Sequence, residues 1–248
     1  MNVLLVGGCA AAGGVAGLVL DEVAARIPRP APAPKIPVDG ADGALAETLP
    51  APEPYLPPPP GVLEHVLSVL VTAFLFGAAA VRFGPDPALA AYCVLFAGLV
   101  AVSVADIRVG LVPRKLLYPT LVLMVVALVA ASAVSGEYHR LLQAAVGGVG
   151  AFVVFFIIWF ISPRSMGMGD VRLAGVIGVG LGWIGYRQLY LGFLVAFIVG
   201  VVIGVAKMLV QGGGRKTSLP FGPALAVGAV VGVLWGTQLA NLWFHTGS

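Results

Sequence analysis

The sequence contains several long stretches that are almost entirely apolar and carry no charge. Residues 141–161 and 188–206, for example, hold no Asp, Glu, Lys or Arg. A helix needs about 20 mainly apolar residues to cross a hydrocarbon core of about 30 Å. Only 10% of the 248 residues are charged and 59% are hydrophobic, whereas soluble domains carry about 25% charged residues. The composition excludes an ordinary soluble domain and predicts an all-α, polytopic integral membrane protein.

The apolar runs and the breakers between them predict about eight transmembrane helices. The sixth is short and rich in glycine, so a half-buried helix, and hence seven crossings, is an alternative there. The predicted helices cover residues 3–25, 62–82, 88–106, 116–135, 141–161, 170–185, 188–210 and 219–243.

The chain divides into three regions: a first transmembrane helix at 1–27, a linker at 28–61 and a membrane-embedded core at 62–248. Residues 28–60 hold 12 of the 19 prolines, with Ala, Asp and Glu among them. Such a composition cannot bury enough apolar surface to fold by itself, so we expect a disordered or extended linker.

Lys and Arg are distributed unevenly between the two sets of connections. The connections after the second, fourth and sixth helices hold 3 of the 14 and the other connections hold 11. Positive charge collects on the cytoplasmic side, so both termini are predicted to lie outside. Without the sixth helix, Lys and Arg would be divided more evenly between the two sides of the membrane. The larger set is Arg26, Arg29, Lys35, Arg108, Arg114, Lys115, Arg164, Arg172, Lys207, Arg215 and Lys216, and the smaller is Arg82, Arg140 and Arg187.

Two aspartates lie at the predicted cytoplasmic ends of apolar runs. Asp106 ends the run from residue 88, and Asp170 opens the sixth segment directly after Gly167-Met168-Gly169. Each is followed two positions later by an Arg, which is also typical of an interfacial ion pair with a snorkelling arginine. Because acidic residues at such places are costly, each is also a candidate functional group.

A pair of carboxylates at a membrane border can perform acid–base chemistry. Two carboxylates a few ångströms apart cannot both ionise easily, so one holds a proton, and together they can activate water and protonate a leaving amine. Gly167 and Gly169 would let a substrate backbone or a neighbouring helix approach Asp170 closely. This arrangement is that of aspartic proteolysis.

Three separated motifs stand out along the chain: Asp106-Ile107-Arg108 with Val112-Pro113, then Gly167-Met168-Gly169-Asp170-Val171-Arg172, and Leu219-Pro220-Phe221-Gly222-Pro223. In order and spacing they resemble the motifs of the type IV prepilin peptidases, a family of GxGD intramembrane aspartic proteases. The opening helix is similar too, although Asp21 and Glu22 stand where the family more often has other residues.

The resemblance implies an endopeptidase that removes the short basic leader from prepilins or pseudopilins, cutting before their hydrophobic stem. Asp106 and Asp170 would be the catalytic pair, with no cofactor, metal or nucleic acid involved. The enzyme would lie in the bacterial inner membrane with its active site facing the cytoplasm. The residues themselves do not assign the acid and the base, the substrate or the oligomeric state.

The chain departs from the bifunctional members of that family between the first two helices. Those members carry an insert with two CxxC pairs that is associated with N-methylation, whereas this chain has only Cys9 and Cys93 and no CxxC pair. We therefore expect a peptidase without the usual methyltransferase insert, and methyl transfer that does not need this insert stays an open alternative. Two other classes stay open on the residue pattern: a small transporter or channel that moves protons or cations through the two aspartates, and an inactive structural subunit.

Overall fold

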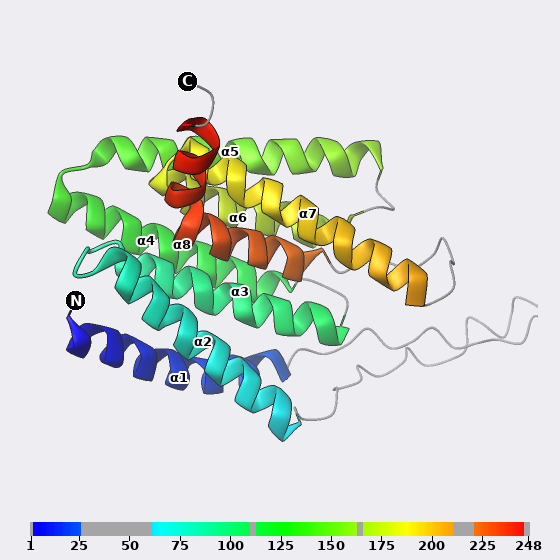
Figure 1. The fold of residues 1–248 in the computed structure, drawn as a ribbon, viewed down its shortest axis with the longest axis horizontal. Helices are drawn as coiled ribbons and strands as arrows, with labels where there is room; N and C mark the ends of the chain where they lie inside the picture. Colours follow the sequence, from blue (N-terminus) through cyan, green and yellow to red (C-terminus); the bar gives the residue numbers. More distant parts are fainter. Residues whose placement is uncertain (1, 26–60, 110–112, 163–165, 211–220, 246–248) are drawn as a thin grey trace, which may run out of the picture.

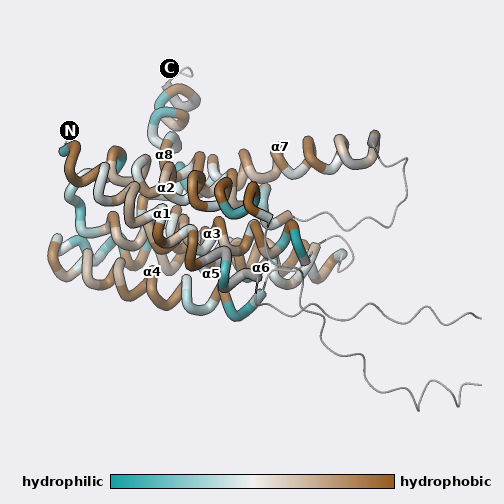
Figure 2. Tube along the Cα trace, turned by 90° about the horizontal axis from the view of Figure 1, so that it is seen from below, coloured by the Kyte–Doolittle hydropathy of each residue, from teal (hydrophilic) through white to brown (hydrophobic). Residues whose placement is uncertain are grey.

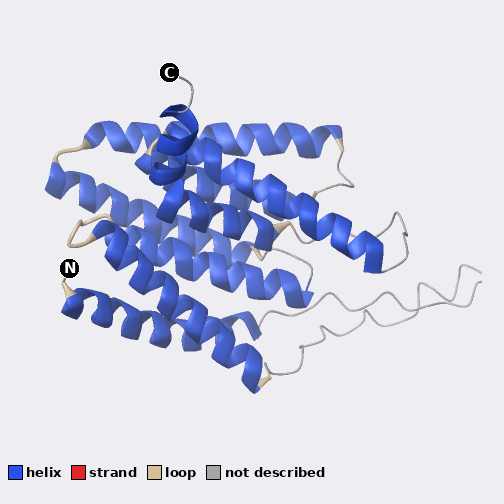
Figure 3. Ribbon diagram, viewed as in Figure 1, coloured by secondary structure: helices blue, strands red, loops and turns tan. Residues whose placement is uncertain are grey.

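The protein is a bundle of eight helices in a computed structural model that describes residues 2–25, 61–109, 113–162, 166–210 and 221–245. No strand occurs in these ranges (Figure 3). The helices are α1 (Val3–Ala25), α2 (Val62–Phe83), α3 (Leu89–Val109), α4 (Arg114–Ser135), α5 (Tyr138–Ile161), α6 (Met168–Ile184), α7 (Tyr186–Val210) and α8 (Gly222–His245). The predicted fold class is confirmed. The linker at 28–60 lies outside the described residues.

Six of these helices are long and apolar enough to cross a membrane: α2, α3, α4, α5, α7 and α8. Apolar residues cover most of their length (Figure 2). The apolar part of α1 is shorter, Val3–Val19, and α6 has 17 residues. The chain is a multi-pass membrane protein, and full crossings by α1 and α6 stay predictions.

Successive helices run in alternating directions (Figure 1). The last turns of α1, α3, α5 and α7 and the first turns of α2, α4, α6 and α8 lie at the same end of the bundle. We call it the aspartate end, because Asp106 is in the last turn of α3 and Asp170 in the first turn of α6. This alternation agrees with the two sets of connections derived from charge. That the aspartate end faces the cytoplasm stays a prediction.

The short helix α6 lies at the centre of the bundle and packs against α3, α4, α5, α7 and α8. Of its 17 residues, 11 are buried. Neighbouring helices, and not lipid, therefore surround most of its backbone, which explains why it needs neither the length nor the hydropathy of a lipid-facing helix. Neighbouring helices bury most of α6, and whether this segment crosses the membrane fully or only in part stays a prediction.

Close contact between α5 and α6 depends on glycine. A Cβ atom on Gly147 of α5 would lie 2.6 Å from the carbonyl oxygen of Gly178 on α6, and a Cβ on Gly178 would lie 2.5 Å from that of Gly147. Real side chains do not tolerate such distances. Small residues of this kind let membrane helices approach backbone to backbone, where packing rather than hydrophobicity drives association.

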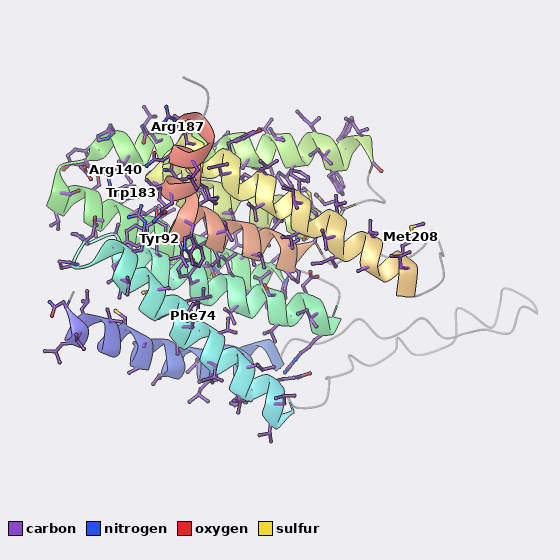
Figure 4. The ribbon with its side chains drawn as sticks, viewed as in Figure 1. Phe74, Tyr92, Arg140, Trp183, Arg187 and Met208 are labelled. Carbon is purple, nitrogen blue, oxygen red and sulfur yellow. The ribbon has the colours of Figure 1, made fainter. Side chains whose placement is uncertain are left out.

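The end of the bundle opposite the aspartates carries polar contacts between helices (Figure 4). The buried hydroxyl of Tyr92 on α3 donates to the carbonyl of Gly180 on α6 at 2.9 Å. Arg82 of α2 donates to the hydroxyl of Thr237 on α8 at 3.0 Å. These bonds connect α3 with α6 and α2 with α8. They therefore help to fix the position of α6 relative to α3, and that of α8 relative to α2.

Three helix boundaries near the aspartates differ from the prediction, and one of them is the start of α6, which begins at Met168 and not at 170. Helix α3 continues to Val109 instead of ending at 106, so Asp106 lies within its last turn. Helix α8 begins at Gly222 and not at 219. Pro223 occupies its first turn, where a missing backbone N–H costs nothing because the first N–H groups of a helix have no partner within it.

Candidate active site

Asp106 is a buried carboxyl on the last turn of α3. The residue is 4% exposed, although the polar Arg108 and the exposed Ile107 follow it immediately. An ionisable group is rarely buried at such a position without a partner or a function.

Asp170 lies in the first turn of α6 and is 6% exposed. Its Oδ2 atom accepts a hydrogen bond from the backbone N–H of Gly167 at 3.3 Å. The N–H of Asp170 in turn donates to the carbonyl of Gly167 at 3.0 Å. The aspartate therefore caps its own helix, and the positive end of the helix dipole favours a negative charge there.

The fold brings these two predicted residues together. Asp106 is close enough for its charge to act on the carboxyl of Asp170. They are the two acidic residues among the buried polar side chains of the described ranges. A buried pair of this kind is the geometry that acid–base catalysis by two carboxyl groups requires.

Helix α8, whose start carries the third of the family-like motifs, supplies a third element of the site. A Cβ atom on Gly222 would lie 2.7 Å from Oδ2 of Asp106. Only a residue without a side chain lets the start of α8 approach the carboxyl this closely. The positive end of the α8 dipole thus lies against Asp106, as the start of α6 lies against Asp170, and both helix ends favour negative charge in the pair.

Phe221 holds the start of α8 in this position. Its ring packs against Phe197 of α7, with 5.8 Å between ring centroids, and against Phe155 of α5 at 6.5 Å. A Cβ on Gly200 of α7 would lie 2.4 Å from the same ring. The phenylalanine of the Pro-Phe-Gly-Pro segment is therefore an anchor between α5 and α7, and the glycine beside it is the residue that contacts Asp106. Pro220 lies outside the described residues.

The arginine that follows Asp106 binds an acidic residue on another helix. The guanidinium of Arg108 forms an ion pair with Glu64 of α2 at 2.6 Å. The Arg108 side chain is 11% exposed and that of Glu64 is 60% exposed. The pair joins α2 to α3 one half-turn beyond Asp106, so snorkelling towards water alone does not account for Arg108.

The backbone conformation and the packing of the described residues do not require a glycine at position 167. Its φ of −75° is open to any residue, and a Cβ there would make an ordinary 3.5 Å contact with Oδ2 of Asp170. Among the described residues, no neighbouring helix makes the close approach expected at this glycine.

Comparison with known proteins agrees with the geometry. The model of the type IV leader peptidase family matches residues 93–205, a range that contains both aspartates. A prepilin leader peptidase/N-methyltransferase of Bacillus subtilis is 33% identical over 174 residues, which are 70% of this chain and 67% of that protein. The chain belongs to the type IV leader peptidase family.

Other members of the family are similar to the same extent. Prepilin leader peptidase/N-methyltransferases of Pseudomonas aeruginosa and Stutzerimonas stutzeri are 31% and 32% identical over 73% and 71% of this chain. The matched regions are 62% and 60% of those two proteins, so the chain spans roughly three-fifths of their length. No solved structure matches the chain. The expected family is confirmed.

Proposed function

We propose that this protein is an aspartic endopeptidase that cleaves the basic leader from prepilins or pseudopilins. The observation that carries the proposal is the burial of Asp106 and Asp170 next to one another, each against the start of a helix, within the range that matches the family. The relatives named above are prepilin leader peptidases, which supports the substrate class.

The two carboxyl groups divide the chemistry between them. One is ionised and takes a proton from a water molecule, whose oxygen then attacks the carbonyl carbon of the scissile peptide bond. The other is protonated and gives its proton to the leaving amine as the carbon–nitrogen bond breaks. The products are a leader with a new carboxyl terminus and a mature protein with a new amino terminus. The hydrogen bond to Asp170 and the helix starts beside both carboxyls are already in place and need no reorganisation during the reaction.

The site is proposed to face the cytoplasm from the inner membrane. The support is the charge distribution of the sequence, because Arg108, Arg114, Lys115 and Arg172 all lie at the aspartate end. A leader rich in positive charge would also be retained on that side of the membrane. The cleavage site then lies where the apolar stem of the substrate leaves the lipid.

We further propose that the chain lacks the methyltransferase activity that its relatives' names include. The support is the absence of any CxxC pair in the sequence, whose two cysteines, Cys9 and Cys93, are free. Cleavage would then yield a product with an unmodified amino terminus.

The proposal is tested by leader cleavage in membranes that contain a cognate prepilin. Parent, Asp106→Ala and Asp170→Ala are compared at matched expression by the mobility shift of the substrate. Glu137→Ala, which removes an acidic residue at the opposite end of the bundle, serves as the control. Loss of processing in both aspartate variants, with normal processing in the control, supports the dyad. Undiminished processing in either aspartate variant contradicts it and favours a transport or structural role.

A further inference from the structure

An apolar groove of about 550 Å³ runs along the outside of the bundle beside the aspartates. Residues of α2, α3 and α8 line it. Val71 and Phe74 project from α2, Val104 lies on α3, and Val227 lies on α8. Phe74 is labelled in Figure 4. The groove therefore lies along α3 between α2 and α8, and its lining is almost entirely hydrocarbon.

One end of the groove is lined by chain neighbours of the candidate active-site residues, although neither aspartate itself lines it. Ile107, Arg108 and Pro223 line this end. Ile107 follows Asp106 directly, and Pro223 follows Gly222, the residue that contacts the Asp106 carboxyl. A chain that lies in the groove and continues past Ile107 and Pro223 would therefore meet the aspartate pair.

The same end carries an ion pair whose two side chains differ in their exposure to solvent. Glu64 and Arg108 both line it, but the carboxylate is the exposed partner, 60% against 11% for the arginine side chain. Partly exposed charges attract segments of opposite sign and repel those of equal sign. The mouth of the groove thus presents a carboxylate to a basic segment next to an apolar one.

A second groove, of about 650 Å³, lies between α4, α5 and α6 and reaches the site from the side of Asp170. Met168 and Arg172 line its end, and Arg172 is the one charged residue among the described residues of its lining. A basic leader would meet a like charge there, which disfavours binding. Charge therefore distinguishes the two grooves, although both are apolar and both lead to an aspartate.

We propose that the groove between α2 and α8 binds the apolar stem of the substrate, with Glu64 facing the basic leader. This inference rests on the proposed function and names the surface that selects the substrate. A helical stem has a diameter of about 10 to 12 Å with its side chains, so one face of it would fill the groove while the other stays in lipid. The scissile bond, which joins the leader to the stem, then lies at the aspartates.

Photo-crosslinking tests where the stem lies. The full-length Asp106→Asn protein, which keeps its substrate uncleaved, carries a benzophenone amino acid at Val71 or Val227 in phospholipid nanodiscs with a prepilin. Val154 on the lipid-facing side of α5 is the matched control, because it is 54% exposed against 46% for Val71. Val149 probes the second groove. Adducts with the prepilin at Val71 and Val227, and none at Val154 or Val149, support the proposal. Adducts with phospholipid alone at Val71, equal yields everywhere, or adducts at Val149 overturn it.

Cleavage kinetics separate this inference from the proposed function. Val71→Trp narrows the groove and Glu64→Gln removes its exposed charge, while Val154→Trp adds the same bulk to the lipid-facing side of α5. Each groove variant is expected to raise KM for a full prepilin by roughly tenfold with little change in kcat, as loss of uniform binding does. If the parent cleaves no prepilin, the proposed function fails. If the parent cleaves and both groove variants keep its KM, only the groove is wrong.

Discussion

Oδ2 of Asp106 lies against Gly222, the first residue of α8, at a place where a Cβ atom would be only 2.7 Å away. The contact joins two segments that are far apart in the sequence and fixes how closely α8 approaches the candidate catalytic pair. It gives the Pro-Phe-Gly-Pro segment a physical role: the ring of Phe221 anchors the segment between α5 and α7, and the glycine leaves room for the carboxyl.

Gly222→Ala is expected to lower the rate of leader cleavage without unfolding the protein. The added methyl group would displace the Asp106 carboxyl, and a shift of about 1 Å at a reacting group can cost about 100-fold in rate. Cleavage rate and thermal unfolding in detergent are measured together. Gly77→Ala is the control, because its Cβ would lie at an ordinary 3.7 Å from that of Ala10. A Gly222→Ala protein that cleaves at the parent rate would show that the contact has no catalytic importance.

Gly147→Val is expected to destabilise the bundle and to reduce activity together. The side chain would meet the carbonyl oxygen of Gly178 at 2.6 Å and push α5 away from α6, which carries Asp170. Overpacking of this kind costs about 1 to 3 kcal/mol. Gly150→Val on the same helix is the comparison, since no atom lies within 4 Å of a Cβ at Gly150. Equal unfolding temperatures for the two variants would contradict the tight α5–α6 contact.

Tyr92→Phe is expected to lower stability while leaving the chemistry intact. The change removes the hydroxyl that donates to the carbonyl of Gly180 and leaves that buried oxygen without this donor. A buried carbonyl that loses its donor costs about 1 to 3 kcal/mol. Thermal unfolding measures the loss, and Tyr138→Phe, at an exposed position, is the reference. The prediction fails if both variants unfold at the same temperature.

A cysteine-free variant, Cys9→Ala with Cys93→Ala, is expected to cleave prepilin at the parent rate. Both thiols are free and lie on α1 and α3, and neither cysteine belongs to a CxxC pair. Mass spectrometry of the mature product, formed in the presence of a methyl donor, is expected to show an unmodified amino terminus. A methylated product from the parent protein would refute the proposed lack of methyl transfer.

The helices were predictable because each corresponds to a local run of apolar residues in the sequence. A run of apolar residues as long as a bilayer is thick is typical of a membrane-spanning helix and rare in soluble domains. All eight predicted helices are present among the described residues. Helix ends were less predictable. The start of α8 is set by Pro223 and by the anchoring of Phe221 in a distant aromatic cluster, neither of which interrupts the apolar pattern.

The candidate site was predictable to the extent that its residues are unusual for a membrane protein. Asp106 and Asp170 stand out because acidic groups at the ends of apolar runs are rare. Gly222 and Glu64 do not, since a glycine in an apolar segment and an acidic residue at a helix start are both common. Both residues are singled out only by contacts between helices. Gly222 contacts the Asp106 carboxyl, and Glu64 pairs with Arg108.

The most direct test of the account is single-turnover cleavage of a prepilin by the purified, reconstituted protein and by its Asp106→Asn, Asp170→Asn and doubly substituted forms. Asparagine keeps the shape of aspartate but can neither ionise nor give up a proton as a carboxylic acid does. The account predicts that each single substitution reduces cleavage to background and that the double substitution reduces it no further, because the two carboxyls act as one unit. Substantial cleavage by either single variant, in a protein that unfolds at the parent temperature, would contradict the two-aspartate mechanism.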